Sequence, residues 1–587
     1  MKRLIYIIVM VSASLMFSCK KDTFLDNTTT DLLTADKVFA DSTYTLNFLN
    51  DIYAYAGQDI VPLRYSYITS GTGNDYACLE DLTTQSRSYY SEPQASWIKG
   101  ASTSSNSPFL NYYTRYYKEI RACNLFRKRV VEAPLSEATK SLRSAEARFL
   151  RVWYYGQLVR LYGGVPLVGD EPYEITATFE YKRSTLKECI DYIISECDAV
   201  TQELPTAASQ NATEYGHITS GMALALKARI LLMAASPLFN GDPITTDATL
   251  QPLLCYSATY DNTLWQKAAE ACKALIDLNQ YSLNVDNSIP GNGFKMLFLS
   301  RKNSEYIFPY MVSPNYLLEY YRFPRSRGGY GFSNPSHNLV ACFGMKNGKA
   351  ITDAASGYDA SNPYLNREPR FYASIIYNQA NVYLNSTQKM DPVNIYSYYN
   401  SSGALVPSAD GIQNYYTYTG YYSRKMANDS VYVTTSKNRV YPLIRYAEII
   451  LGYAEALNEA GSAPGTDVYT YIKMIRERAG IDAGSDGNYG LATGLTKEEM
   501  RTIIQNEYRV ELAYEGHWFY DSRRWRTAEV EENKEMQGMR AVLQSSGAYT
   551  YEPITVYSSV FSSRMYFMPF PLTEVNMSTT FYQNPGW

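Results

Sequence analysis

Three glutamates near the C-terminal end have the spacing of a possible acid–base centre. Glu507, Glu511 and Glu515 follow at four-residue steps and so share one helix face, with His517 and Asp521 just beyond. Such carboxylates could act as the acid and base of a hydrolase. Four arginines lie close by in the sequence: Arg509, Arg523, Arg524 and Arg526. Because interleaved acids and arginines commonly form ion-pair networks that lock helices, the sequence favours a structural role.

No other segment offers a catalytic centre. The chain contains no H-E-x-x-H or G-x-S-x-G motif, and its only histidines are His217, His337 and His517. The glycine-rich stretch 327–331 lacks the flanking strand and helix of a phosphate-binding loop. We therefore predict that the protein is not an enzyme.

The cysteines do not form an evident metal or disulfide pattern. Seven cysteines follow Cys19, and no C-x-x-C pair occurs. Cys189 and Cys197 fall on one helix face about 12 Å apart, which is too far for a disulfide. We interpret the seven as small core residues and predict no metal site and no cofactor, leaving open a structural calcium ion.

Amphipathic helices dominate both ends of the chain. Apolar residues repeat at three-and-four spacing from Leu186 to Leu204, and Thr185 with Glu188 forms a capping box. The alanine-rich stretch 221–235 and Gly452 offer small surfaces for close helix packing. Paired helices of this kind are typical of tetratricopeptide-like repeats. Further helical stripes cover 142–153, 264–276, 443–457 and 467–479.

Two segments lack this helical periodicity. Between about Asp286 and Arg439, glycine, proline, asparagine and tyrosine are abundant, and only short pieces such as 430–435 look like strands. The stretch 59–101 is similarly irregular. Long irregular segments on a rigid scaffold commonly carry binding residues.

Tyrosine is the most unusual feature of the composition. The 587 residues include 57 tyrosines, close to a tenth of the chain. A tyrosine ring presents a flat apolar face with a hydroxyl at its rim, which suits sugar rings and other mixed polar ligands. The composition therefore points to a recognition surface.

The N-terminus has the layout of a signal peptide. Lys2 and Arg3 precede an apolar run, Leu4–Phe17, that is too short to cross a bilayer as a helix. Ser18 and Cys19 then end the segment like a bacterial lipobox, from which Met16 and Phe17 depart. We predict a signal peptide over 1–18, a lipid on Cys19 and a lipidated tether over 19–36, because several acyl chains anchor a protein firmly.

The net charge excludes one class of partner. A formal charge of −4 and a pI of about 5.7 do not fit a nucleic-acid-binding protein, which needs a concentrated basic face. No second apolar run is long enough to span a membrane.

Several segments, in order along the chain, resemble the SusD-like (RagB/SusD) outer-membrane lipoproteins of Bacteroides-type bacteria. AEARFLRVWYYGQLVRLYGGVPLV (145–168) is similar to a signature helix of that family, and YPLIRYAEIILGYAEALNEAG (441–461) is the strongest single match. One departure is Glu507-Tyr508-Arg509, where the family often has Glu-Arg followed by Arg. The remaining similar segments are 224–235, 264–283, 475–480, 506–525, 569–575 and 582–587.

The resemblance implies a mainly α fold, a tetratricopeptide-like helical scaffold with long irregular loops and a few short strands. It divides residues 37–587, one domain, into a scaffold (37–285) with a binding loop (59–110), an irregular ligand-binding insert (286–440) and C-terminal signature helices (441–587). It also implies a protein without catalysis, held on the outer leaflet of the outer membrane. Such a protein caps a SusC-like TonB-dependent transporter, and together they capture and import an oligosaccharide.

The family's ligand face selects candidate residues in the binding loop and the insert. Aromatic rings would stack on sugar C–H surfaces, while Asn74, Asp75 and Arg325 would hydrogen-bond hydroxyls. The tyrosine-rich stretch 414–426 resembles a family strand, so we interpret it as structural. The candidates are Asn74, Asp75, Tyr89, Tyr90, Trp97, Tyr316, Tyr320, Tyr321, Arg325, Tyr330 and Phe332.

Three alternatives stay open at this point. The same scaffold could bind a peptide, as some members of the family do. A helical-repeat adaptor without a small ligand is another class, and a glycan hydrolase is a third. Binding of glycans against peptides, co-purification of a partner, and release of new reducing ends would separate them.

Overall fold

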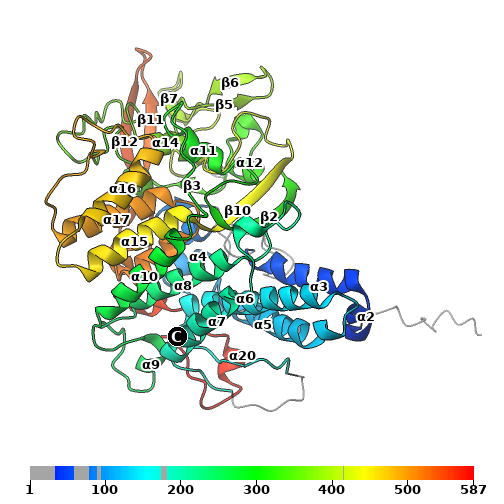
Figure 1. Ribbon diagram of the computed structural model, residues 1–587. Helices are drawn as coiled ribbons and strands as arrows, with labels where there is room; N and C mark the ends of the chain where they lie inside the picture. The colour runs from blue at the N-terminus through cyan, green and yellow to red at the C-terminus, as the bar shows by residue number, and fades with distance from the viewer. Residues whose placement is uncertain (1–33, 58–77, 89–93, 174–180, 414–415) are drawn as a thin grey trace, which may run out of the picture.

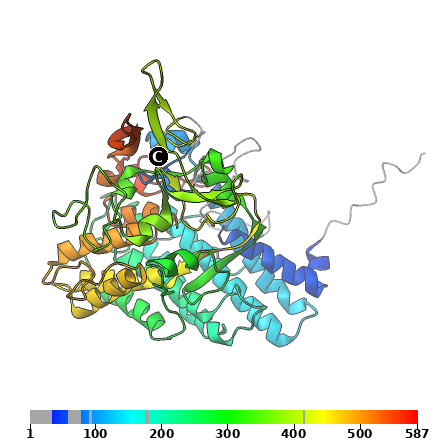
Figure 2. The same ribbon diagram turned by 90° about the horizontal axis from the view of Figure 1, so that it is seen from above.

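Long helices form the lower part of the molecule, and strands and loops lie above them (Figure 1). The computed structural model describes residues 34–57, 78–88, 94–173, 181–413 and 416–587. The first described helix, α2 (Ala35–Phe39), lies at one edge of the molecule in both views (Figures 1 and 2).

The scaffold is a succession of packed helices. Helices α5, α6, α7, α8 and α10 each contact the next, and α10 contacts α15, which in turn contacts α16 and α17. This neighbour-to-neighbour packing confirms the predicted tetratricopeptide-like arrangement. The main helices are α3 (Ser42–Tyr55), α5 (Leu110–Arg129), α6 (Glu137–Tyr162), α7 (Leu186–Thr201), α8 (Ser220–Ala235), α10 (Thr263–Ile276), α15 (Tyr446–Ala460), α16 (Thr466–Arg478) and α17 (Lys497–Glu511).

Local sequence signals explain where several helices begin. The Thr185 hydroxyl accepts from the Glu188 backbone N–H, and the Glu188 carboxylate accepts from the Thr185 N–H, so the predicted capping box starts α7. Thr496 and Glu499 form the same box at the start of α17.

A glycine lies where three scaffold helices meet. A Cβ on Gly452 of α15 would lie 3.4 Å from Cys272 Sγ of α10 and 3.4 Å from a methyl carbon of Leu232 of α8. The predicted close packing at Gly452 is therefore confirmed, because a methyl group alone would fill the space and a side chain longer than alanine would push the helices apart.

The strands form small, separate sheets. β2 (Tyr306–Asn315) pairs antiparallel with β10 (Lys437–Arg445). The largest sheet has the order β12–β11–β7–β8, in which β11 (Glu535–Leu543) runs parallel to β7 (Tyr396–Tyr399) and antiparallel to β12 (Tyr549–Ser558). The others are β1 (Ser86–Arg87), β3 (Asn334–Pro335), β4 (Ile375–Ile376), β5 (Asn381–Leu384), β6 (Lys389–Pro392), β8 (Leu405–Pro407) and β9 (Tyr422–Ser423).

Short helices connect these parts. They are α4 (Gln94–Ile98), α9 (Gln251–Leu254), α11 (Asn292–Leu297), α12 (Leu317–Arg322), α13 (His337–Val340), α14 (Pro369–Ser374), α18 (His517–Arg524), α19 (Ala528–Glu531) and α20 (Leu572–Val575).

Two sequence predictions of local structure are wrong. Residues 430–435 form turns rather than a strand, and the real strand in this region is β10. Leu443 lies in β10, so α15 begins only at Tyr446. In both places, the apolar pattern covers too few residues to determine whether the segment is a strand, a helix or a turn.

The cysteines are small core residues, as the sequence predicted. All seven cysteines of the described residues are free thiols, and all except the half-buried Cys342 are buried. Burial raises the pKa of Cys189 to about 12, so its thiol stays protonated at neutral pH.

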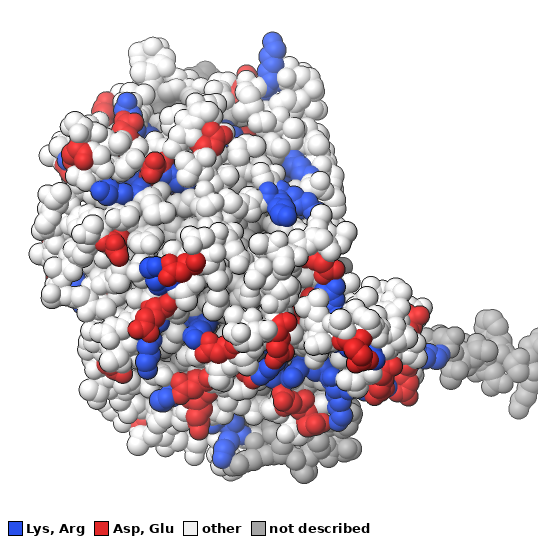
Figure 3. All heavy atoms as spheres, viewed as in Figure 1, with Lys and Arg blue, Asp and Glu red and all other residues white. Residues whose placement is uncertain are grey.

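No helix among the described residues combines the length and apolar character needed to cross a bilayer. On the face seen in Figure 3, charged side chains of both signs are dense over the lower, helical part, and the middle of the molecule is largely uncharged.

Candidate functional site

An aromatic cluster forms where the chain turns back on itself after β2. Helix α12 carries Tyr320 and Tyr321, and the segment that follows returns beside it. The backbone N–H of Tyr330 donates to the carbonyl of Tyr320 at 2.8 Å, and that of Phe332 donates to Tyr321 at 2.7 Å. These two bonds place four aromatic residues from opposite sides of one turn next to each other.

The rings of this cluster contact one another continuously. Tyr320 lies 4.8 Å from Tyr330 between ring centroids, and its hydroxyl donates to that of Tyr330 at 3.2 Å. Tyr330 and Phe332 stack at 5.8 Å, and Tyr316 meets Tyr320 edge-on at 5.5 Å. These are favourable aromatic pair geometries, so the rings support each other as one surface.

Arg325 packs against the rings of this cluster. The Arg325 guanidinium carbon lies 4.5 Å from the ring centroid of Tyr330 and 5.5 Å from that of Tyr416. Tyr316 is 37% exposed, and the other members are half-buried. We call Tyr316, Tyr320, Tyr321, Arg325, Tyr330 and Phe332 the aromatic cluster; it combines flat apolar faces with hydroxyl and guanidinium donors.

The glycines of 327–331 shape this turn. A Cβ on Gly329 would lie 2.1 Å from the carbonyl oxygen of Phe323, so only glycine fits there. Gly331 has φ of +73°, and its Cβ would lie 2.6 Å from the Tyr416 carbonyl oxygen. The glycine-rich stretch therefore serves to bring Tyr330 and Phe332 beside α12.

The structure brings together all six candidates from the insert. One member of the neighbourhood, Tyr416, was not among the candidates, although it belongs to the tyrosine-rich stretch 414–426. That stretch divides: Tyr421 and Tyr422 are fully buried, as the structural interpretation predicted, whereas Tyr416 reaches Arg325.

The prediction that Trp97 contacts a ligand is wrong. Its side chain is 1% exposed, and its ring centroid lies 4.9 Å from that of Phe109 and 6.4 Å from that of Trp587. Trp97 is therefore a core residue and is not available to a surface ligand. The position of Trp97 in an irregular segment gave no sign of these distant partners. The candidates Asn74, Asp75, Tyr89 and Tyr90 lie outside the described residues, as does Cys19.

The three spaced glutamates form a buried ion-pair network, as predicted. Glu507 accepts from Arg370 at 2.9 Å and Arg476 at 2.7 Å, and Glu515 accepts from Arg445 at 2.7 Å. The partners differ from the arginines near in sequence, because Arg509 pairs with Glu531 and Arg524 with Glu455. The network is assembled from distant parts of the chain.

The charges of this network hold the glutamates ionised. Burial opposes ionisation of Glu511, but the guanidinium groups of Arg478, Arg445 and Arg370 outweigh it and keep its pKa well below the usual range. Burial also opposes ionisation of Glu507, where Arg370 and Arg476 lower the pKa. Carboxylates that are fully paired and permanently charged are poorly suited to act as general acids.

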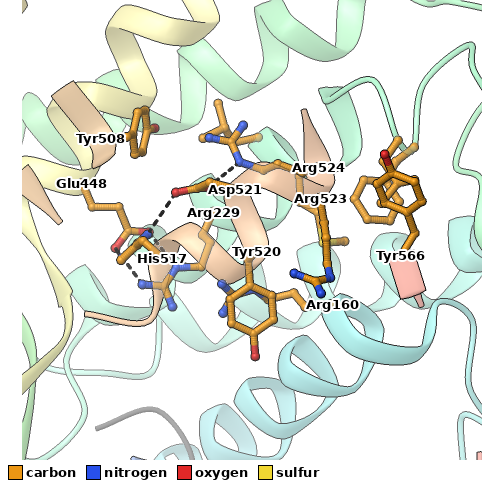
Figure 4. Close-up of a pocket in the computed structure, with 14 residues that line it drawn as sticks. Arg160, Arg229, Glu448, Tyr508, His517, Tyr520, Asp521, Arg523, Arg524 and Tyr566 are labelled. Carbon is orange, nitrogen blue, oxygen red and sulfur yellow. Dashed lines mark hydrogen bonds and ion pairs between the residues drawn. The ribbon is translucent and has the colours of Figure 1, made fainter. Parts of the chain in front are cut away.

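His517 and Asp521 line a small internal cavity, shown in Figure 4. His517 lies between Glu448, at 3.5 Å from Nε2, and Asp521, at 3.7 Å from Nδ1. Burial opposes ionisation of Asp521, but Arg524 and then His517 lower its pKa to about 2. The cavity holds only about 40 Å³, far below the size of a site for a sugar.

One group of side chains in the described residues has metal-ligand spacing. The ligand atoms of Glu146, Glu214 and His217 lie within 4.8 Å of one another. Arg143 occupies the space among them, donating to Glu146 at 2.5 Å and Glu214 at 2.8 Å and lying 3.1 Å from His217 Nδ1. A guanidinium therefore already supplies the positive charge that a metal ion would bring.

Comparison with known proteins identifies the class. A profile described as "SusD family" matches residues 294–587, half of the chain, and one described as "Starch-binding associating with outer membrane" matches residues 23–232. The chain therefore belongs to the SusD family. The second description associates its members with the outer membrane.

Individual relatives agree with this assignment. The chain is 24% identical over 382 residues to "SusD-like protein P2" of Formosa agariphila, a match that spans 65% of this chain and 64% of that relative. A SusD-like protein from Bacteroides fragilis has the same fold, with a TM-score of 0.74, 24% identity and coverage of 94% of this chain and 99% of that one. A SusD-like carbohydrate-binding protein from the same organism has a TM-score of 0.70, 22% identity and coverage of 92% and 99%.

Proposed function

We propose that this protein binds an oligosaccharide through the aromatic cluster. The observation that carries the proposal is the continuous contact of five aromatic rings with Arg325 beside them, on a surface turn of the insert. Flat ring faces suit the C–H surfaces of sugars, and the tyrosine and arginine donors suit their hydroxyls. Membership of the SusD family supports glycan binding in general.

Calorimetric titration against panels of oligosaccharides and of peptides tests this proposal. We expect binding of at least one oligosaccharide and a loss of about tenfold in affinity for Tyr330→Ala, because an aromatic contact of about 1.4 kcal/mol corresponds to that factor. Tyr44→Ala is the matched control, since Tyr44 is 46% exposed on α3, outside the cluster. Binding of peptides alone would overturn the proposal in favour of the peptide-binding alternative.

The protein acts as a binding protein and not as a hydrolase. The spaced glutamates are held in ion pairs, His337 lies 3.0 Å from the Tyr421 hydroxyl, and the cavity beside His517 is too small for a substrate. A reducing-end assay on every bound oligosaccharide should stay silent. Release of new ends that Glu511→Gln abolishes would show catalysis instead.

We further propose that a lipid on Cys19 holds the protein on the outer membrane, where it delivers the oligosaccharide to a SusC-like TonB-dependent transporter. The sequence around Cys19 and the outer-membrane association of the family support the anchor. Labelling of cells with an alkyne fatty acid should mark the protein, and Cys19→Ala should remove the label. Affinity capture from detergent-solubilised membranes should recover a TonB-dependent barrel; recovery of a different partner without any ligand response would support the adaptor alternative.

A further inference from the structure

A second cavity lies at the start of β2, away from the aromatic cluster. Its volume of about 320 Å³ is at the small end of the range for ligand sites and suits one or two sugar rings. It shares no lining residue with the cluster. The lining polar and aromatic side chains are Gln210, Asn211, Tyr215, Thr219, Gln280, Tyr281, Lys302, Asn303, Ser304 and Tyr306.

The cavity wall is nearly uncharged. Lys302 is the only charged side chain that the described residues contribute to the lining, and its Nζ lies 5.4 Å from the ring centroid of Tyr215. Two other large cavities differ in this respect. The cavity of about 540 Å³ is lined by both acids and bases, among them Glu459 and Arg501, and that of about 470 Å³ includes Arg370 and Arg476. A neutral polar wall is suited to a neutral polar ligand.

Buried hydroxyls in this wall lack partners. Tyr306 is 4% exposed, and its hydroxyl makes no hydrogen bond within the described residues; the hydroxyl of Tyr215 is in the same situation. A buried polar group without a partner is costly, so a bound hydroxyl-bearing molecule would restore lost hydrogen bonds. Burial raises the pKa of Tyr215 to about 12, so this group is a protonated donor at neutral pH.

Three amide side chains are held in place by the backbone. Gln280 Oε1 accepts from the Ala207 N–H at 3.2 Å, Asn211 Oδ1 accepts from the Thr213 N–H at 3.0 Å, and Asn303 Oδ1 accepts from the Tyr306 N–H at 2.9 Å. Because each amide uses its oxygen in this way, its NH₂ group is oriented. The NH₂ group of Asn303 donates to the Leu297 carbonyl at 3.3 Å, so Gln280 and Asn211 are the amides positioned to donate to a ligand. Fixed amide donors beside tyrosine hydroxyls fit a molecule that has many hydroxyl acceptors.

We propose that this cavity binds a neutral sugar ring as a second site, independent of the aromatic cluster. The two sites lie toward opposite ends of β2: Tyr306 begins the strand, and Tyr316 follows its last residue. Ten residues of strand span about 33 Å. A ligand of several sugar units could therefore contact both sites, whereas a monosaccharide would occupy only one.

Saturation-transfer NMR with monosaccharides tests this site. The probes are D-glucose, D-galactose, D-mannose and N-acetyl-D-glucosamine, with cationic D-glucosamine as the charged comparison. The protein carries Tyr320→Ala and Tyr330→Ala, so that the aromatic cluster does not contribute. We expect transfer to at least one neutral probe and none, or markedly less, to D-glucosamine, because Lys302 repels its ammonium group.

Variants of the cavity locate the binding. Gln280→Ala combined with Asn211→Ala should weaken the binding at least about tenfold, and Tyr306→Phe should weaken it severalfold. Gln505→Ala is the matched control, because it deletes an amide side chain that lines the other cavity, of about 540 Å³. This variant should leave the binding of the monosaccharide unchanged. The thermal midpoint of each variant is measured, and Gln280 and Asn211 are not core residues, so folding should persist.

Three outcomes would overturn the proposal: no transfer to any neutral probe, transfer that survives Gln280→Ala with Asn211→Ala, or equal binding of D-glucosamine. These measurements use a protein whose aromatic cluster is disabled, so a negative result would not count against oligosaccharide binding by the cluster. Conversely, a failure of the cluster to bind an oligosaccharide would not count against monosaccharide binding in this cavity.

Discussion

The helical scaffold and the insert are stabilised in different ways. The main apolar core runs through the scaffold and the C-terminal helices, and among the described residues none of its buried members lies between residues 309 and 442. The insert instead has a smaller apolar cluster, around residues such as Phe323, Val382 and Tyr422. A third cluster joins the two regions at their boundary, because it packs Phe371 of the insert with Val510 and Tyr514.

Buried ion pairs cross that boundary. Arg370 of the insert donates to Glu507 and Glu511 of α17, and Lys425 of the insert donates to Glu515 at 2.7 Å. Arg445, at the end of β10, joins Glu305 to Glu511 and Glu515. Ion pairs require specific geometry, so this network helps to fix how the insert sits on the scaffold.

Removing one arginine of the network should lower the free energy of unfolding more than any substitution described below. Arg370→Met removes the cation that pairs with Glu368 and one of the cations that pair with each of Glu507 and Glu511, so we expect the free energy of unfolding to fall by about 3–5 kcal/mol. Urea denaturation followed by circular dichroism measures this. Lys187→Ala, which breaks the exposed pair with Asp191, should change stability by less than about 1 kcal/mol. Equal effects of the two variants would contradict the distinction.

Acid should weaken the same network. The pKa values of Glu507, Glu511 and Glu515 lie below the ordinary value in the folded protein, so their stabilising contribution is complete above the unfolded pKa of about 4.3. It is lost as pH falls from there through the folded values. Denaturation at a series of pH values tests this sign, and stability that rises on acidification below pH 4 would oppose it.

A change to the insert turn should affect binding more than folding. Gly329→Ala forces a Cβ against the Phe323 carbonyl, so the turn must shift and separate Tyr330 and Phe332 from α12. We expect a loss of stability of about 1–2 kcal/mol and a loss of oligosaccharide affinity of at least about tenfold. Gly465→Ala is the matched glycine control, since Gly465, like Gly329, has no positive φ but has open space around it. Normal affinity in Gly329→Ala would show that the turn does not position the site.

The most exposed ring should give the smallest effect. Tyr316→Ala should leave the free energy of unfolding within about 0.5 kcal/mol of the unmodified protein and weaken oligosaccharide binding about fivefold, equivalent to about 1 kcal/mol. Parallel calorimetric and denaturation measurements check both numbers. A large loss of stability would place Tyr316 in the packing of the insert rather than in the binding surface.

The two regions also differ in how well the sequence predicts them. Helix α7 was predicted because its capping box and apolar face lie within a single segment. The ring contacts of the aromatic cluster join residues at most eleven positions apart, so the family resemblance and the composition of the insert together were a sufficient guide to it.

Contacts between distant parts of the chain were not predictable in this way. The burial of Trp97 depends on Trp587, at the other end of the chain, and nothing near Trp97 reveals that contact. Likewise, the glutamates on α17 were expected to pair, but their arginines come from α14, β10 and α16. Spacing within one helix specifies a face but not the residue that it meets.

A crystal structure of the chain from residue 34 onward, with a bound oligosaccharide from the titration panel, tests the central claim most directly. We predict a sugar ring stacked on the face of Tyr316 or Tyr330, with a hydroxyl within hydrogen-bond distance of Arg325. An oligosaccharide bound elsewhere, with the aromatic cluster left uncovered, would contradict the account.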